Sequence, residues 1–210
     1  NSIVVNVQNI SYGQNCWDIE EAISKAKIDK NDPSCIVFTG GTTGFPKGAL
    51  LSQINLCRGA LNGALVEGKV FNIKYLSLIP FSHIFGLIKN LLSCILTGSE
   101  LYIVSNPALF AKEAAQYQPE TLVLTPGLCN IVLTLMNTYG DKIFGGNFKT
   151  IIAGGANVPA KLINKFLEKG IRCLPGYGLT EATNLVSGNA SINEKPSSVG
   201  VPYPEQELKI

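Results

Sequence analysis

Histidine, methionine and tryptophan are nearly absent from this sequence, and its cysteines are never closely spaced. The 210 residues contain a single histidine, His83, and six cysteines, no two of which form a C-x-x-C pair. A zinc site with the usual cysteine and histidine ligands is therefore not expected. Scattered cysteines are more typical of small apolar residues in a reduced interior than of a disulfide framework.

Charged residues are also scarce, and their signs nearly cancel. Lysine and arginine number 17 against 15 aspartates and glutamates, which gives a net charge of +2. This balance does not favour a nucleic-acid partner or attraction to a membrane surface. Hydrophobic residues make up 46% of the chain and charged residues 15%, a composition that excludes intrinsic disorder and predicts a substantial core.

The sequence has no basic and apolar leader and no long apolar run. Its most apolar stretch, 87–96, is interrupted by Lys89 and Asn90 and is too short to span a bilayer. We therefore expect a cytoplasmic protein without a transmembrane segment. Residues 207–210 have the pattern of a strand, so we also expect the chain to be a fragment of a longer protein.

Short apolar runs alternate with longer amphipathic segments along the chain. Apolar runs without polar alternation are typical of strands buried on both faces, as in parallel sheets. The pattern therefore predicts an α/β fold with a doubly wound, mostly parallel sheet flanked by helices. Strands are predicted at 35–39, 75–79, 101–104, 121–124, 150–153 and 171–174, and helices at 17–27, 52–67, 85–96, 107–116, 127–137 and 159–168.

A glycine-rich segment directly follows the first of these strands and is predicted to connect it to a helix. Glycines let backbone amides turn toward an anion, threonine hydroxyls add donors, and a lysine supplies positive charge. The threonine pair and the lysine favour a phosphate-binding loop over a plain surface turn. The segment reads Gly40-Gly41-Thr42-Thr43-Gly44-Phe45-Pro46-Lys47-Gly48.

Two common nucleotide-binding loops do not fit this segment. Counted from Gly41, a Walker A loop needs glycine at 46 and serine or threonine at 48, where this chain has Pro46 and Gly48. The hydroxyl that binds Mg²⁺ in that loop is therefore missing at its place. The dinucleotide fingerprint G-x-G-x-x-G is absent as well, so a P-loop nucleoside triphosphatase is a remote alternative.

The segment 38–48 resembles the phosphate loop of the AMP-forming acyl-CoA synthetases, relatives of luciferases and of peptide-synthetase adenylation domains. Four further segments resemble motifs of that family in the same order: P-F-S-H-I-F-G at 80–86, G-G-A at 154–156, G-Y-G-L-T-E at 176–181 and S-V-G-V-P at 198–202. The resemblance identifies 32–210 as the AMP-binding core of the family's large N-terminal domain, truncated at both ends. Residues 1–31 are then a leading segment with one helix.

The resemblance implies a reaction and its substrates. Members of this family join a carboxylic acid to ATP, release pyrophosphate and form an acyl-adenylate, and many then transfer the acyl group to coenzyme A. The segments 144–156 and 176–189 are most similar to fatty acyl-CoA synthetases, while aryl and medium-chain acids stay open. An α-amino acid is disfavoured because 80–86 contains no aspartate.

Two alternatives remain beside this ligase. One is an acyl-AMP ligase that loads a carrier protein, and the other is a nucleotide-binding fragment without catalysis. Gly40, which stands where the family's loop usually has serine, motivates the second. The family's ribose-binding aspartate and its C-terminal lysine have no counterpart in these 210 residues, so we expect the residues alone to be inactive.

The resemblance also assigns roles to single residues, with ATP or AMP, Mg²⁺ and coenzyme A as ligands. Thr180 would donate to the α-phosphate, Glu181 would hold Mg²⁺, and His83 would shape the site beside the carboxylate of the acid. These three residues and Lys47 are the candidate catalytic residues. The residues alone also allow a core histidine, a core tyrosine at 177 and a helix cap at Thr180. The remaining candidates are Thr39, Gly41, Thr42, Thr43, Gly44 and Lys47 for the β- and γ-phosphates, Gly154, Gly155 and Ala156 beside the adenine and acyl groups, and Tyr177, flanked by Gly176 and Gly178, against the adenine.

Overall fold

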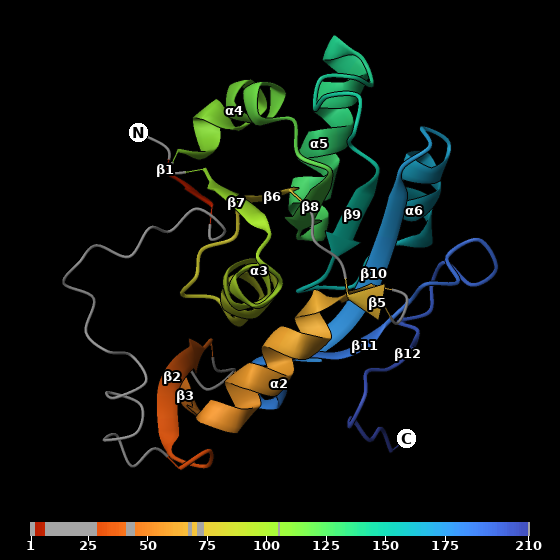
Figure 1. The fold of residues 1–210 in the computed structure, drawn as a ribbon. Helices are drawn as coiled ribbons and strands as arrows, with labels where there is room; N and C mark the ends of the chain where they lie inside the picture. Colours follow the sequence, from red (N-terminus) through yellow and green to blue (C-terminus); the bar gives the residue numbers. More distant parts are fainter. Residues whose placement is uncertain are drawn as a thin grey trace.

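An eight-stranded sheet lies at the centre of the molecule (Figure 1). The computed structural model describes residues 3–6, 29–40, 45–66, 69–70, 74–104 and 106–209. The strands of the sheet are β1 (Ile3–Asn6), β6 (Lys74–Ser77), β7 (Glu100–Ile103), β8 (Thr121–Leu124), β9 (Thr150–Ala153), β10 (Arg172–Leu179), β11 (Asn184–Gly188) and β12 (Val201–Pro202).

The five central strands of this sheet run parallel, in the order β7-β6-β8-β9-β10. Antiparallel strands extend both edges, with β1 beside β7, and β11 and β12 beyond β10. Along the chain, β6 comes first and β7 is added on one side of it, whereas β8, β9 and β10 are added in turn on its other side. The direction in which strands are added therefore reverses, and β6 and β8 are the neighbours at this switch point. In doubly wound sheets, ligands bind outside the carboxyl ends of the strands at such a point. The predicted fold class is confirmed.

Helices cover both faces of the sheet (Figure 1). One face carries α4 (Phe110–Tyr117), α5 (Pro126–Tyr139) and α6 (Ala160–Leu167), and the other carries α2 (Gln53–Ala64), α3 (Ser93–Thr97) and the π-helix η2 (Gly86–Leu92). A 3₁₀ turn, η3 (Pro107–Leu109), leads into α4. Thr125 caps α5 by accepting from the Leu128 N–H, and Ser52 and Asn55 form a capping box that starts α2.

The strands bury side chains on both of their faces, as the unbroken apolar runs predict. In β8, Leu122 and Leu124 belong to the cluster beneath α4, α5 and α6, whereas Val123 packs into a second cluster with Phe85 and Cys94 on the opposite face. Successive side chains of a strand point to opposite faces. A central strand covered on both sides therefore needs apolar residues at every position.

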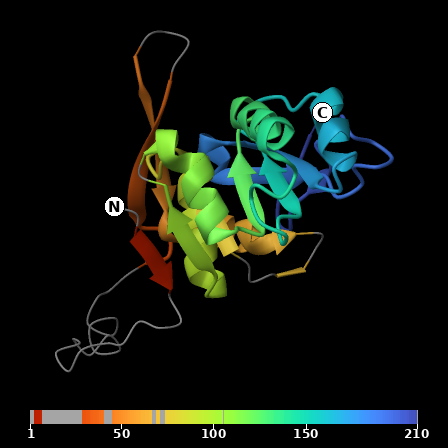
Figure 2. The ribbon, with the colours of Figure 1, turned by 90° about the horizontal axis from the view of Figure 1, so that it is seen from above.

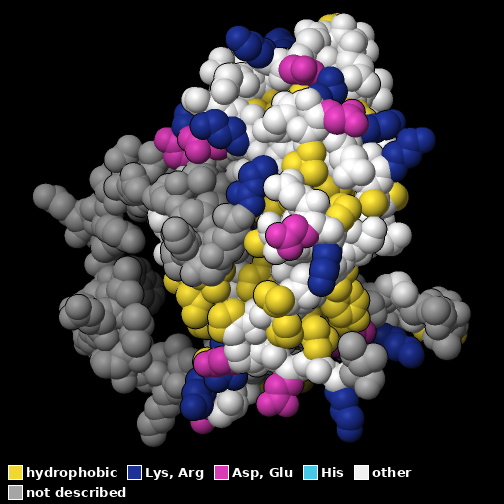
Figure 3. All heavy atoms as spheres, turned by 90° about the vertical axis from the view of Figure 1, so that its right-hand side faces the viewer, with side chains coloured by type: hydrophobic (Ala, Val, Ile, Leu, Met, Phe, Trp, Pro, Cys, Tyr) yellow, Lys and Arg dark blue, Asp and Glu magenta, His cyan; other side chains and the backbone are white. Residues whose placement is uncertain are grey.

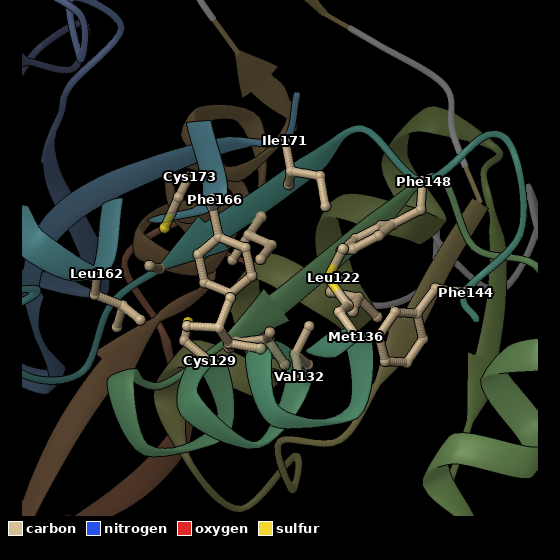
Figure 4. Close-up of a cluster of buried hydrophobic side chains, with 14 of the residues drawn as sticks. Leu122, Cys129, Val132, Met136, Phe144, Phe148, Leu162, Phe166, Ile171 and Cys173 are labelled. Atoms are coloured by element: carbon tan, nitrogen blue, oxygen red, sulfur yellow. The ribbon is translucent and has the colours of Figure 1, made fainter. Parts of the chain in front are cut away.

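The larger cluster is built mainly from α5, α6 and the strands beneath them (Figure 4). Cys129, Val132 and Met136 lie three and four residues apart on one side of α5, which is the spacing of a single helix face. They pack with Phe166 of α6 and Leu122 of β8, and all five side chains are fully buried. This face of α5 therefore fixes the helix against the sheet.

The glycine-rich segment lies in a different setting from the one predicted. The strand expected at 35–39 is part of β2 (Pro33–Thr39), but β2 pairs antiparallel with β3 (Lys47–Ser52) in a separate hairpin that projects from the main sheet (Figure 2). The segment therefore joins two strands, not a strand and a helix. Val37 is buried while Ile36 and Phe38 are exposed, so the apolar run does not indicate burial on both faces here.

The other predicted elements within the described residues are confirmed, apart from one; the strands at 121–124 and 150–153 have the predicted ends, and the ends of the others are shifted. The helix expected at 52–67 ends at Ala64, where the chain enters β4 (Leu65–Val66), which pairs with β5 (Lys69–Val70). The strand expected at 207–210 is wrong, because 207–209 are irregular. The helix expected at 17–27 lies outside the described residues. None of the helices in the described part of the chain has the length and apolar composition that a membrane crossing needs.

Phe144 offers a test of the larger cluster. Its fully buried ring lies between Phe110 and Phe148, with ring centroids 5.5 and 5.4 Å away. Phe144→Ala should lower the free energy of unfolding by about 3–5 kcal/mol, because it leaves a cavity in a packed core. Urea unfolding curves measure this loss. Tyr139→Ala, at a side chain that is 69% exposed, should change stability by about 0.5 kcal/mol or less; equal losses would contradict this packing.

Candidate active site

Loops at the carboxyl ends of the parallel strands enclose a cavity of about 900 Å³. Its wall includes His83 after β6, Gly154 after β9 and Gly176 near the end of the parallel part of β10. The β2–β3 hairpin adds Thr39 and Lys47. Because parallel strands end at the same edge of a sheet, segments far apart in the sequence meet at this cavity, as the sheet order predicts for a ligand site.

A second cavity, of about 360 Å³, lies against the same loops. Residues 156–158 after β9 and 197–199 near the C-terminus line it. The wall that it shares with the larger cavity consists of Gly155, Pro175, Gly176, Tyr177 and Gly178. Tyr177 therefore stands at the junction of two spaces, and the interpretation of Tyr177 as a core residue is wrong, since the side chain is exposed.

The structure brings most of the predicted site residues to these two cavities, while their ligand roles stay predictions. Gly41, Thr42, Thr43 and Gly44 lie outside the described residues. Ala156 lines the smaller cavity. The larger cavity is lined by Thr39, Lys47, His83, Gly154, Gly155, Gly176, Tyr177, Gly178, Thr180 and Glu181.

A close approach of β10 and β11 sets the position of Tyr177. The pairing of these strands shifts between Tyr177 and Gly178, and a β-bulge of this kind re-aims the side chains beside it. A Cβ at Gly178 would stand 1.4 Å from the Asn184 carbonyl oxygen, so the two backbones meet this closely only because residue 178 is glycine. Thr183, which follows η4, and Asn184, the first residue of β11, have φ of 55° and 84°, a region that asparagine tolerates better than most residues.

Thr180 and Glu181 lie in η4 (Thr180–Ala182), the 3₁₀ turn between β10 and β11. Leu179 occupies the N-cap position of this turn and makes no side-chain cap bond, so the interpretation of Thr180 as a helix cap is wrong. The Glu181 carboxylate is exposed and lines the larger cavity. A carboxylate beside a hydroxyl offers hard oxygen ligands, and Mg²⁺ commonly takes one or two carboxylates together with phosphate oxygens.

His83 lies in the turn between β6 and η2, exposed on the wall of the larger cavity. The interpretation of His83 as a core residue is therefore wrong. Its Nδ1 accepts a hydrogen bond of 3.1 Å from the Phe85 N–H. This bond fixes the ring and, in the neutral form, leaves the proton on Nε2. His83 can therefore present an N–H donor to a ligand.

Apolar side chains also reach the surface around the two cavities. Tyr177, Leu179, Val199 and Val201 are exposed. Leu179 and Val201 line the larger cavity, Val199 lines the smaller one, and Tyr177 lines both. Figure 3 shows apolar side chains gathered on the face that lies to the right in Figure 1, with charged side chains around them. The site therefore combines apolar surface with the polar groups of the loops.

Lys89 and Asn184 are among the polar residues on the wall of the larger cavity that the sequence analysis did not predict as site residues. Lys89 Nζ donates to the Gly63 carbonyl oxygen, and its burial lowers the pKa of the ammonium to about 7. Asn184 Nδ2 makes no hydrogen bond to any residue that the structure describes. Lys89 follows Ile84, another wall residue, by five positions, the spacing of one π-helical turn. The signal that could have identified Lys89 as a wall residue was the presence of a lysine inside an otherwise apolar helix.

Comparisons with known proteins agree with this architecture. The long-chain-fatty-acid–CoA ligase of Bacillus subtilis is 29% identical over 90% of this chain and 35% of its own length, and the 2-succinylbenzoate–CoA ligase of Bacillus anthracis is 26% identical over 91% and 40%. The structure of the anthranilate CoA ligase AuaEII in complex with anthranoyl-AMP superposes with a TM-score of 0.71, at 20% identity, over 82% of this chain and 34% of that one.

The fold is that of the N-terminal domain of adenylate-forming enzymes. A sequence profile described as AMP-binding enzyme matches residues 4–210. The chain belongs to this AMP-binding enzyme family, and it spans 35% and 40% of the length of the two curated relatives.

The buried Lys89 makes stability depend on pH. Its pKa is about 7 in the folded chain against an ordinary value of 10.5, so the unfolded chain binds more protons between these values. Raising the pH from about 7 to about 8.5 should therefore increase the free energy of unfolding, by at most about 1.4 kcal/mol per pH unit from this group.

Urea unfolding at several pH values in this window measures the effect as the difference between the wild type and a variant. Lys89→Met removes the titrating group and should flatten the slope. Lys161→Met, at an exposed lysine of α6, should keep the wild-type slope. Parallel slopes for the wild type and Lys89→Met would show that Lys89 does not titrate there.

Proposed function

We propose that this chain is the catalytic core of an acid–thiol ligase, which activates a carboxylic acid with ATP and transfers the acyl group to coenzyme A. The observation that carries the proposal is the convergence of Lys47, Tyr177, Thr180 and Glu181 on one cavity, from segments that match the family in order. Residues 32–210 would form the AMP-binding core, and residues 1–31 a leading segment.

The two cavities suggest how the ligands divide the site. The smaller cavity would take the adenine, with the flat ring of Tyr177 against it. The larger cavity, about 900 Å³ in volume, would take the acyl group and the phosphates. Gly155, with φ of +81°, would let the backbone pass close to the nucleotide where the two spaces meet. The anthranilate CoA ligase of the structural comparison binds anthranoyl-AMP, a compound that joins an acyl group to AMP.

In the first step, a carboxylate oxygen of the acid attacks the α-phosphorus of ATP, and the bond from that phosphorus to pyrophosphate breaks with both electrons leaving on pyrophosphate. Both reactants are anionic, so the site must supply positive charge and hydrogen-bond donors. Lys47 would neutralise the departing phosphates, and the Thr180 hydroxyl would donate to the α-phosphate. Glu181 would hold Mg²⁺, which would supply further charge neutralisation when bound.

In the second step, the sulfur of coenzyme A replaces AMP on the acyl carbon, and AMP and a proton are released. His83 would hold the acyl oxygen through its Nε2–H, since its Nδ1 is already engaged by the Phe85 N–H. This arrangement positions the carbonyl carbon without requiring His83 to act as a base.

The substrate is proposed as a carboxylic acid without restriction to fatty acids. One relative is named for long-chain fatty acids and another for 2-succinylbenzoate, and both match this chain at similar identity. Their names also support coenzyme A as the acceptor. The fatty-acid expectation is thus widened to acids in general.

Acid-dependent release of pyrophosphate from ATP tests the proposal on the full-length protein, with Mg²⁺ and a panel of aliphatic and aromatic acids. Glu181→Gln and Thr180→Ala should each lower kcat/KM by about 10²-fold or more, since each removes a group that acts on the reacting phosphate. Mass spectrometry should detect the acyl-adenylate, and chelation of Mg²⁺ should abolish its formation.

Glu194→Gln is the matched control, because Glu194 is an exposed glutamate that lines neither cavity. It should leave kcat/KM unchanged. ATP binding without pyrophosphate release in the presence of any acid of the panel would overturn the proposal and favour a nucleotide-binding protein without catalysis.

A further inference from the structure

The hairpin formed by β2 and β3 is apolar on both of its faces, yet only one face is packed. On the inner face, Val37 and Leu51 are buried in a cluster that includes residues of η2. The opposite face carries Ile36, Phe38 and Leu50, which are 57%, 69% and 60% exposed. These three residues are called the outer face of the hairpin below.

The strand pairing places the residues of the outer face in one patch. Ile36 stands opposite Leu50, and Phe38 stands opposite Gly48. Residues that stand opposite each other in an antiparallel pair project from the same side of the sheet. A Cβ at Gly48 would lie 2.6 Å from Ile36 Cγ2 and 3.5 Å from Phe38 Cε1, so both side chains lie over this glycine. The outer face is therefore a continuous apolar surface on a hairpin that projects from the main sheet (Figure 2).

The hairpin has few of the features that protect an exposed pair of strands from association. Strands with open edges usually carry charged side chains, prolines or bulges. In β2 no residue is charged, and its proline and its register shift lie at its first residues. The one charged residue of β3 is Lys47, which lines the larger cavity. Among the described residues, β2 and β3 have no third strand beside them. An apolar surface of this kind marks a site of contact with other parts of a protein.

The size of the outer face favours a segment of the same chain over a second copy of the protein. A fully covered phenylalanine buries about 150–250 Å², so three partly exposed side chains offer less than the roughly 800 Å² that each partner contributes to a stable dimer. A segment of the same chain also avoids the loss of translational and rotational freedom that opposes association. The 210 residues span only 35% and 40% of the length of the two curated relatives, so more than half of each relative lies outside the matched part.

We propose that the outer face of the hairpin is a docking surface for a segment of the full-length protein outside residues 1–210, which covers Ile36, Phe38 and Leu50 with apolar side chains. This interface does not depend on the proposed ligase function. The docked segment also bears on the candidate site, because Thr39 and Lys47 form the last pair of the same hairpin and line the larger cavity. By packing on the hairpin, it fixes the strands that carry these two residues.

Hydroxyl-radical footprinting of the full-length protein tests, without any substitution, whether the outer face is covered. Phe38 and Tyr139 are both 69% exposed in this structure, so they form a matched pair. The oxidation rate of each ring is compared with its rate in a short peptide of the same local sequence. We expect Phe38 to be protected by about tenfold or more, as for a group that reacts only after local opening, and Tyr139 to stay near the peptide rate. A Phe38 ring that is oxidised at a rate near that of its peptide would overturn the proposal.

Photo-crosslinking identifies the segment that covers the face. The amino acid p-benzoylphenylalanine in place of Phe38 keeps an aromatic ring on the outer face and, on irradiation, bonds to C–H groups in contact with it. The same probe in place of Tyr139 is the control. Mass spectrometry of the purified full-length protein should find cross-links from position 38 to peptides of the same chain outside residues 1–210, and should not find them from position 139. If the variant at 38 does not fold, the probe replaces Leu50.

Other occupants of the outer face give different products. Cross-linked dimers would show a second copy on it, and cross-links confined to residues 1–210 would show that this part of the chain covers it. Either result, or the lack of any cross-link from positions 38 and 50, overturns the proposal. Pyrophosphate release decides the ligase function separately, since a covered outer face in a protein without that activity supports the docking surface and overturns only the ligase.

Discussion

The parallel pairing of β6, β8, β9 and β10 is the constraint on which the rest of this structure depends. Parallel strands need long return connections, and here these are the helices that bury both faces of the sheet. The same pairing sends the carboxyl end of each strand to one edge. His83, Gly154 and Gly176 become neighbours of one cavity for this reason, although no local feature of the sequence connects them.

The antiparallel turn from β10 to β11 then places the side chains of Thr180 and Glu181 at that edge. Were β10 followed by another long crossover, Thr180 and Glu181 would be carried away from the sheet. The tight turn at η4 instead keeps both on the cavity wall. It requires the close backbone approach at Gly178 and left-handed φ at Thr183 and Asn184. Backbone strain of this kind is concentrated at functional sites, where the surrounding structure holds it in place.

The sequence predicts those elements whose hydrophobic pattern matches the burial of their side chains. It does not predict the features that depend on contacts with distant parts of the chain. The run T-L-V-L of β8 is apolar because both of its faces are covered. The run at 35–39 looks alike, yet Ile36 and Phe38 are exposed on a hairpin, and no local signal separates the two cases. Most of the motif residues that the structure describes line the two cavities, as their positions after the parallel strands imply. Lys89 was not predicted as a wall residue, because its place on the wall depends on packing against a helix, α2, that lies elsewhere in the sequence.

Lys89 is possible only because α2 presents small residues to η2. A Cβ at Gly63 would clash with Ser93 Oγ, at the start of α3 directly after η2, so glycine is what allows α2 to approach η2 and α3. Ser93 Oγ donates to the Ala60 carbonyl at 3.0 Å, and the Gly63 carbonyl accepts from Lys89. The Gly63 carbonyl thus offsets part of the cost of burying the Lys89 ammonium at a close helix crossing. A methionine at 89 would be expected to fill the same space without that cost.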